Sequence, residues 1–235
     1  MSVVLITGGT GAIGTALVEE FSRTEDVAFT FCSNEREAAV ICEKFRAFSV
    51  KMDVSDEKSV KEATERVLKE FGRIDVLVNN AGISLIKPFC DTTEDDWEKQ
   101  ISVNLTGCFR TSKAVVPQMI SRKSGAIVNI TSVWGVHGAS CEVAYSAAKA
   151  GVIGFTKALS KELGLSGITV NAIAPGVIDS RMNSSHLTSD ELSELCYETP
   201  LGRLGKPSEV AAAVRAIAEN HFITGQILGV DGGFY

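Results

Sequence analysis

The sequence predicts an α/β fold in which one doubly wound parallel sheet of about seven strands carries helices on both faces. Short, nearly continuous apolar runs alternate with longer amphipathic segments along the whole chain. Strands of this kind are buried on both faces, which is typical of parallel sheets covered by helices. The 235 residues contain no linker and no repeat at a solenoid period. We therefore expect a single domain over residues 1–235.

The elements follow one another in strand–helix order. Residues 3–7 form an apolar, β-branched run, and the helix expected at 12–21 places Ile13, Leu17 and Phe21 on one face. Further strands are expected at residues 27–32, 47–53, 75–79, 125–131, 168–173 and 226–230. Further helices are expected at residues 35–45, 56–71, 94–120, 144–163 and 208–219. The polar insertion at residues 179–200 would rise above the carboxyl ends of the strands, where a substrate lid belongs.

Composition and charge argue against several classes of function. A net charge of −6 disfavours general binding to nucleic acid or to an anionic membrane. No apolar run approaches the length of a membrane span, and the N-terminus has no signal-peptide pattern. The six scattered cysteines and three separated histidines indicate reduced thiols and no metal site. We expect a cytoplasmic protein.

A glycine-rich turn joins the first strand to the first helix. Gly9, Gly11 and Gly14 spell G-x-G-x-x-G in this position. Glycines there allow a tight turn and let the backbone approach a pyrophosphate, which sits on the helix N-terminus. The motif predicts a dinucleotide site of the Rossmann type.

The end of the second strand indicates which dinucleotide is bound. An NAD site usually carries a carboxylate there, about 20 residues past the glycines. Here the strand ends with Cys32, and Ser33, Asn34 and Arg36 are suited to bind a 2′-phosphate. The alternative is that Arg36 pairs with Glu35 on the exposed start of the next helix. The pattern favours NADPH over NADH.

Tyr145, Lys149 and Ser132 form a candidate proton donor for carbonyl chemistry. Tyr145 and Lys149 are four residues apart on an expected helix, so they share one face. The ammonium group of Lys149 is expected to lower the pKa of the Tyr145 phenol from about 10 toward neutrality. Ser132 stands thirteen residues before the tyrosine, at the end of an expected strand.

Taken together, these motifs resemble the short-chain dehydrogenase/reductase family over essentially the whole chain. The resemblance implies a catalytic set of Asn104, Ser132, Tyr145 and Lys149, in which Asn104 holds a water of a proton relay. It also implies the following cofactor-binding residues: Gly8, Thr10, Gly11, Ile13, Gly14, Asp53, Val54, Asn80, Ala81, Gly82, Pro175, Gly176 and Ile178, together with Ser33, Asn34, Arg36, Tyr145 and Lys149. One departure is Ala12, which stands where the shorter members of the family usually have the middle glycine.

The C-terminal residues 223–226 (ITGQ) and 231–233 (DGG) resemble the tail that many members of the family use in tetramer contacts. This resemblance implies a homotetramer.

Three functions remain open. Residues 200–205 (PLGRLG) and 222–226 (FITGQ) resemble 3-oxoacyl-[acyl-carrier-protein] reductases of fatty acid biosynthesis. An acidic carrier would need basic residues near the entrance of the site, and Arg122 and Lys123 are expected to supply them. The segment around Trp134 and Glu142 also resembles the 5-aminopentanone reductases of elongation factor P, and these two residues would line the mouth of a substrate site. The third reading is a non-catalytic regulator that senses NADPH.

Overall fold

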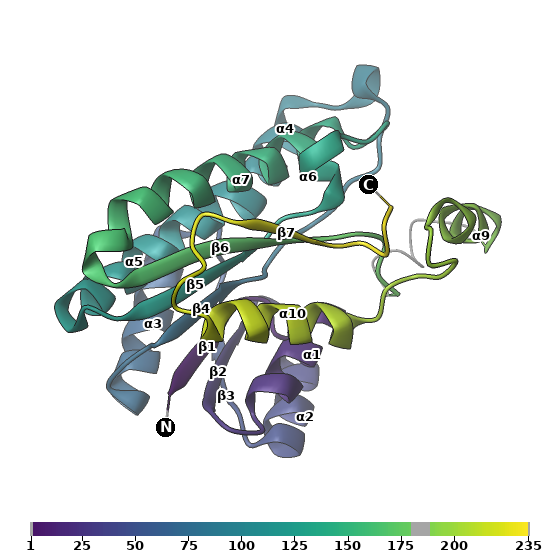
Figure 1. The fold of residues 1–235 in the computed structure, drawn as a ribbon. Coiled ribbons are helices and arrows are strands. Elements are labelled where there is room, and N and C mark those ends of the chain that lie inside the picture. The colour runs from purple at the N-terminus through teal and green to yellow at the C-terminus, as the bar shows by residue number, and fades with distance from the viewer. Residues whose placement is uncertain (1, 180–188, 235) are drawn as a thin grey trace.

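The computed structural model describes residues 2–179 and 189–234. These residues contain one sheet of seven parallel strands in the order β3-β2-β1-β4-β5-β6-β7 (Figure 1). The strands are β1 (Val3–Ile6), β2 (Asp26–Phe31), β3 (Phe48–Lys51), β4 (Val76–Asn79), β5 (Gly125–Ile130), β6 (Ile168–Pro175) and β7 (Ile227–Val230). The predicted fold class is confirmed, with each strand displaced by a few residues at most.

Helices cover both faces of this sheet (Figure 1). One face carries α1 (Ala12–Phe21), α2 (Glu35–Phe45) and α10 (Pro207–Glu219), and the other carries α3 (Glu57–Phe71), α5 (Gly107–Arg122) and α7 (Val143–Leu163). Neighbouring side chains of β1 divide between the two layers, because successive residues of a strand point to opposite faces. Val4 and Ile6 pack with α1 and α10, whereas Leu5 packs with α3 and α5.

The long helix expected at residues 94–120 is divided in two. Helix α4 (Glu94–Ile101) leads into one π-helical turn, Ser102–Thr106, and α5 then continues to Arg122. Apolar periodicity does not reveal such a turn, because it inserts a residue without ending the helix. The structure also contains the short helix α6 (Val133–His137), which the sequence pattern did not predict.

The chain reverses its direction of winding between β1 and β4. From β1 the chain moves outward through β2 to β3, returns to β4 on the other side of β1, and proceeds to β7. In open α/β sheets the crevice at such a switch point, beyond the carboxyl ends of the strands, is where ligands bind.

The predicted lid falls partly on residues 180–188, which lie outside the described residues. Its remaining part forms α9 (Ser189–Glu198), which stands beside the carboxyl ends of the strands (Figure 1). Among the described residues, no helix combines the length and the apolar character needed to cross a bilayer.

Candidate active site

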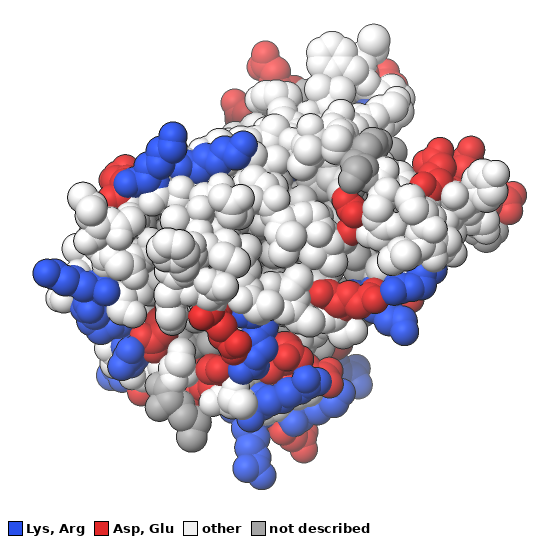
Figure 2. Space-filling model, in the orientation of Figure 1, with Lys and Arg blue, Asp and Glu red and all other residues white. Residues whose placement is uncertain are grey.

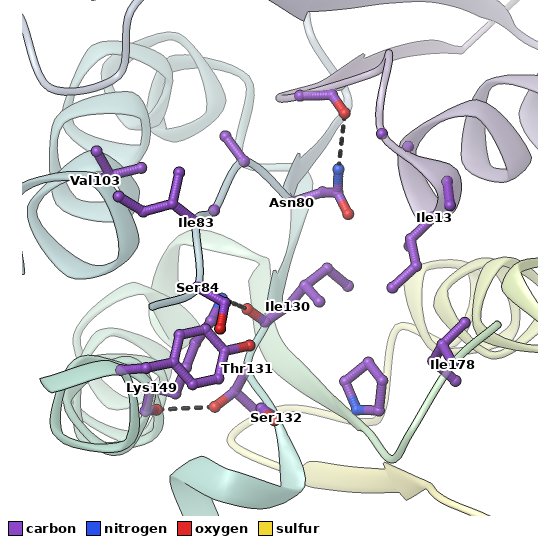
Figure 3. Close-up of a pocket in the computed structure, with 18 of the residues that line it drawn as sticks. Ile13, Asn80, Ile83, Ser84, Val103, Ile130, Thr131, Ser132, Lys149 and Ile178 are labelled. Carbon is purple, nitrogen blue, oxygen red and sulfur yellow. Dashed lines mark hydrogen bonds between the residues drawn. The ribbon is translucent and has the colours of Figure 1, made fainter. Parts of the chain in front are cut away.

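A cavity of about 990 Å³ opens at the carboxyl ends of the strands, on both sides of the switch point. Its wall runs from the glycine turn after β1, past the ends of β2 to β6, to α9. Figure 3 shows the part of this wall between Ile13, Asn80 and Ser132. Of the predicted cofactor-binding residues, seventeen line it: Gly8, Thr10, Gly11, Ile13, Gly14, Ser33, Asn34, Asp53, Val54, Asn80, Ala81, Gly82, Tyr145, Lys149, Pro175, Gly176 and Ile178. Residues scattered over the sequence are thus brought to one site.

The glycine turn holds the backbone close to the cavity. Gly8 has φ of +68°, and a Cβ added to it would lie 2.9 Å from the Ala81 Cα. Gly11 is the N-cap of α1 and makes no side-chain cap hydrogen bond, so the first amide groups of the helix have no cap. Uncapped amides at the positive end of a helix fit a pyrophosphate, and this chemistry agrees with the predicted dinucleotide. Ala12 also lines the cavity at this point.

Thr7 and Asn80 fasten the glycine turn to the end of β4. The Thr7 hydroxyl oxygen accepts hydrogen bonds from the Asn80 and Ala81 amides, each at 2.9 Å. In return, Asn80 Nδ2 donates to the carbonyl oxygens of Thr7 (2.9 Å) and Gly8 (3.1 Å). This reciprocal set fixes two walls of the cavity relative to each other.

The far end of the cavity is bordered by Asp53 and Val54 after β3, and by Ser33 and Asn34 after β2. One carboxylate oxygen of Asp53 accepts from the Ser55 amide (2.8 Å) and hydroxyl (2.6 Å). Arg36 lies exposed in the first turn of α2 and is not among the lining residues. The structure therefore brings all but Arg36 of the predicted ribose and adenine contacts to the cavity wall.

Ser132, Tyr145 and Lys149 meet in the middle of the cavity wall. Ser132 follows β5 and is the N-cap of α6. Its Oγ accepts a hydrogen bond from the Trp134 amide at 3.1 Å, and its side chain is also hydrogen-bonded to Tyr145. Lys149 is 4% exposed, and its Nζ donates to the Ile130 carbonyl oxygen at 2.8 Å (Figure 3). That Nζ lies 5.6 Å from the centre of the Tyr145 ring.

The pKa of Tyr145 differs from the expectation. The pKa of Tyr145 is raised to about 12: burial raises it most, the hydrogen bond to Ser132 lowers it, and the Glu142 carboxylate raises it. Burial also lowers the pKa of Lys149, because an ammonium group loses its hydration there. The expectation that Lys149 draws the phenol toward neutrality took no account of this desolvation. The protein therefore holds Tyr145 as a protonated phenol at neutral pH, which is the form a proton donor needs.

Asn104 lies in the π-helical turn and is fully buried. Its side-chain oxygen accepts from the Ile83 amide (3.0 Å), and its Nδ2 donates to the Ile83 carbonyl oxygen (2.9 Å) and to Gln100 Oε1 (2.8 Å). The side chain thus positions the segment after β4 and is not part of the cavity wall. Its part in a proton relay stays a prediction.

The two predicted mouth residues both line the cavity. Trp134 packs edge-on against Phe234, with ring centres 5.6 Å apart, so the C-terminal tail supports it. Glu142, the N-cap of α7, accepts a hydrogen bond of 2.7 Å from the Ser84 hydroxyl.

Arg122 and Lys123 lie away from this site within the chain. They end α5 directly before β5, at the edge where the parallel strands begin, and Arg122 binds the Ile74 carbonyl oxygen and Asp75. Ser132 lies where β5 ends. The expectation that these two residues flank the entrance was wrong, since sequence distance does not show which end of a strand a loop serves.

Several lining residues escaped sequence reasoning. Ile130 holds Lys149 through a backbone carbonyl, which no side-chain pattern can reveal. The Thr131 hydroxyl donates to the Lys149 carbonyl oxygen at 2.8 Å (Figure 3). Leu195 of α9 also lines the cavity. Of these residues only Ser84 had a signal in the sequence, because it comes two residues after Gly82, which was predicted to bind the cofactor.

Comparisons with known proteins agree with this geometry. The sequence model of the short chain dehydrogenase family matches residues 2–191. The chain is 40% identical to the 3-oxoacyl-[acyl-carrier-protein] reductase FabG of Thermotoga maritima, over 98% of this chain and 96% of the relative. It is 38% identical to the proteins of the same name from Vibrio harveyi (99% and 97% covered) and Staphylococcus aureus strain Mu50 (98% and 97%). The chain is therefore an oxidoreductase of carbonyl and alcohol groups that uses a nicotinamide cofactor, and it belongs to the short-chain dehydrogenase family.

Proposed function

We propose that the protein is an NADPH-dependent reductase that converts a 3-oxoacyl thioester, borne by an acyl carrier protein, to the 3-hydroxyacyl product. The observation that carries this proposal is that Ser132, Tyr145 and Lys149 line one cavity together with the glycine turn and the uncapped start of α1. The names of the relatives support the substrate class. They do not favour the elongation factor P alternative, and the intact Tyr145 and Lys149 argue against a sensor without catalysis.

The roles of the residues follow from their contacts. When bound, the reduced nicotinamide supplies the hydride that the carbonyl carbon accepts. Ser132 donates a hydrogen bond to the carbonyl oxygen, and Tyr145 gives its proton to that oxygen as negative charge develops. An alkoxide is a stronger base than a phenolate, so this transfer is downhill even from a phenol of raised pKa. Lys149, tied to the Ile130 carbonyl oxygen, holds its amino group beside the ring that loses the proton.

The preference for NADPH rests on the absence of a carboxylate at Ser33 and Asn34. Arg36 is the nearest cation along the chain and would reach a 2′-phosphate from the first turn of α2. We expect a lower dissociation constant for NADPH than for NADH. In Asn34→Asp, which places a carboxylate there, the two dissociation constants should differ less. Tighter binding of NADH by the unaltered protein would overturn this preference.

The catalytic proposal is tested by following NADPH oxidation with acetoacetyl-coenzyme A. Tyr145→Phe should lose most turnover and still bind NADPH, because only the transferable proton is removed. Tyr197→Phe is the matched control, since Tyr197 is 92% exposed on α9. Turnover retained in Tyr145→Phe would remove Tyr145 from the mechanism. Turnover of an amino-ketone in place of the thioester would refute the substrate class.

A homotetramer is also proposed, and the exposed edge of the sheet supports it. Among the described strands β7 pairs only with β6, so its outer edge offers unpaired backbone groups. Figure 2 shows a broad uncharged area over β7, between α7 and α10. Phe222, fully exposed just before β7, and Leu228, 45% exposed within it, add apolar surface at this edge. Leu228→Lys should lower the mass measured by light scattering, and an unchanged mass would exclude this edge as the contact.

A further inference from the structure

An aromatic side chain near the C-terminus lies against the wall of the cavity. Phe234 packs edge-on against Trp134, with ring centres 5.6 Å apart and an angle of 79° between the ring planes. Trp134 lines the cavity two residues after Ser132, whereas Phe234 is half-buried and is not among the lining residues. Phe234 can therefore influence a molecule bound in the cavity through Trp134.

The backbone after β7 turns back towards α6 (Figure 1). Gly232 and Gly233 have φ of +69° and +84°, in the left-handed region that favours glycine. The Phe234 amide donates to the Asp231 carbonyl oxygen at 3.3 Å, and the Gly233 amide donates to Asp231 Oδ1 at 2.9 Å. These contacts close a C-terminal turn (residues 231–234) that brings Phe234 onto Trp134.

The C-terminal turn is also fastened to two other parts of the site. The Gly176 amide, on the cavity wall, donates to the Val230 carbonyl oxygen at 3.0 Å, directly before the turn. The Leu201 amide, which follows α9, donates to the Gly232 carbonyl oxygen at 3.2 Å. Because backbone contacts hold the turn on both sides, Phe234 gives Trp134 a fixed surface to pack against.

We propose that Phe234 is a positioning residue for the ketone substrate, and that it holds the Trp134 indole in place as the wall against which the acyl chain packs. An edge-on aromatic pair is favourable beyond the area that it buries, so Phe234 favours one orientation of the indole. A substrate that packs against this orientation binds only the molecules that have it, so its apparent affinity falls with their fraction. The inference rests on the proposed function and concerns the acyl side of that substrate.

The dinucleotide is expected on other parts of the wall, along the glycine turn and the ends of β2 and β3. Cofactor binding should therefore not depend on Phe234.

The experiment compares Phe234→Ala with the unaltered protein in the reduction of acetoacetyl-coenzyme A. The KM for the thioester should rise about threefold to tenfold, which is the loss of one aromatic pair expressed as an affinity. The kcat should change by less than about twofold, because saturating substrate selects the molecules with the indole in place. The dissociation constant of NADPH should stay the same. Phe234→Tyr keeps the ring and should restore the KM.

Two further variants separate this role from a general structural one. Trp134→Ala removes the group through which Phe234 acts, so Phe234→Ala should no longer change the KM in that background. Leu165→Ala is the matched control, since it truncates a fully exposed apolar side chain in the short turn before β6. It should leave the KM unchanged. Light scattering should give Phe234→Ala the same mass as the unaltered protein.

A fluorescence readout follows the position of Trp134 without substrate. The chain has two tryptophans, so Trp97→Phe leaves Trp134 as the one that remains. In this background, Phe234→Ala should make the emission more sensitive to quenching by acrylamide, because the indole loses the ring that packs against it. Phe234→Tyr should restore the weaker quenching.

The inference is refuted if Phe234→Ala leaves the KM for the thioester unchanged, or raises it equally in the Trp134→Ala background. It is also refuted if the rise in KM comes with a lower mass, because assembly would then explain it, or if the quenching does not change. An unaltered protein that does not reduce the thioester, while Phe234→Ala still increases the quenching, would count against the proposed function and leave the positioning of Trp134 standing.

Discussion

Gly14 and Gly11 belong to one motif, yet the structure predicts that they are required for different reasons. A Cβ on Gly14 would overlap the Gly8 carbonyl oxygen and lie 2.8 Å from the Gly9 Cα. Both are backbone atoms, and a side-chain rotation cannot relieve the overlap. For Gly11, the nearest such atom is the Gly8 carbonyl oxygen at 3.5 Å, which is an ordinary contact. Gly11 has φ of −75°, which alanine adopts without strain.

The cost of Gly14→Ala follows from what must move. The turn is held by the Gly9 amide on the Thr30 carbonyl oxygen (2.8 Å) and by Asn80 Nδ2 on the Gly8 carbonyl oxygen (3.1 Å). Overpacking costs about 1–3 kcal/mol, and a weakened hydrogen bond about 1 kcal/mol more. We expect Gly14→Ala to lower the free energy of unfolding by about 3 kcal/mol, which corresponds to roughly 6–12 °C in Tm for a chain of this size.

Gly11→Ala should leave the free energy of unfolding within about 0.5 kcal/mol of the unaltered protein. It should nevertheless raise the dissociation constant of the dinucleotide, because Gly11 is exposed on the cavity wall where a phosphate would approach. Thermal unfolding followed by circular dichroism, and cofactor titration followed by NADPH fluorescence, measure the two effects. The reasoning fails if the Tm of Gly14→Ala lies within about 2 °C of that of the unaltered protein, which is roughly the change expected for a neutral substitution. It also fails if Gly11→Ala is the less stable of the two variants.

Three other substitutions or treatments have defined outcomes. Thr7→Val leaves the Asn80 and Ala81 amides without their acceptor, and it should lower the free energy of unfolding measured by chemical denaturation by about 2–4 kcal/mol. Thr7→Ser keeps the hydroxyl and should lower it by less than half of that. Lys149→Met should abolish turnover while the Tm stays equal or rises, because a buried amino group is replaced by an apolar chain of similar length. A large fall in Tm would contradict this. Burial raises the pKa of Cys108 to about 11. At about pH 8, near the reference pKa of cysteine, a thiol reagent should therefore modify the exposed Cys32 and Cys90 in the folded protein and leave Cys108 intact. Mass spectrometry of the peptides would show which cysteines are modified.

Much of the fold was predictable because its signals are local. Each strand is a short apolar run between turns, and each long helix has an apolar stripe, so their order and the parallel sheet follow from periodicity. The π-helical turn at Ser102–Thr106 was not predictable in this way, since it changes the backbone hydrogen bonds and leaves the apolar pattern intact. The short helix Val133–His137 is too brief to show a period.

The candidate site was predictable as a set of residue types at characteristic spacings, and most of these residues line one cavity. What the spacing could not give is orientation. The part of Asn104 in a proton relay stays a prediction, and only the structure shows that its side chain holds the backbone of Ile83. Arg122 was expected at the entrance, and it lies at the opposite end of β5.

The sequence by itself determined the fold class, the glycine turn that receives a dinucleotide, and the tyrosine–lysine pair, because each depends on contacts between residues close in the chain. The tertiary structure decided the ionisation of that pair. Burial and a carboxylate raise the pKa of Tyr145, and burial lowers that of Lys149, because charge is costly where packing excludes water. Desolvation is a property of the assembled site: it arises when the segments after β4 and β5, which carry Ser84 and Ser132, meet the start of α7, which carries Tyr145 and Lys149.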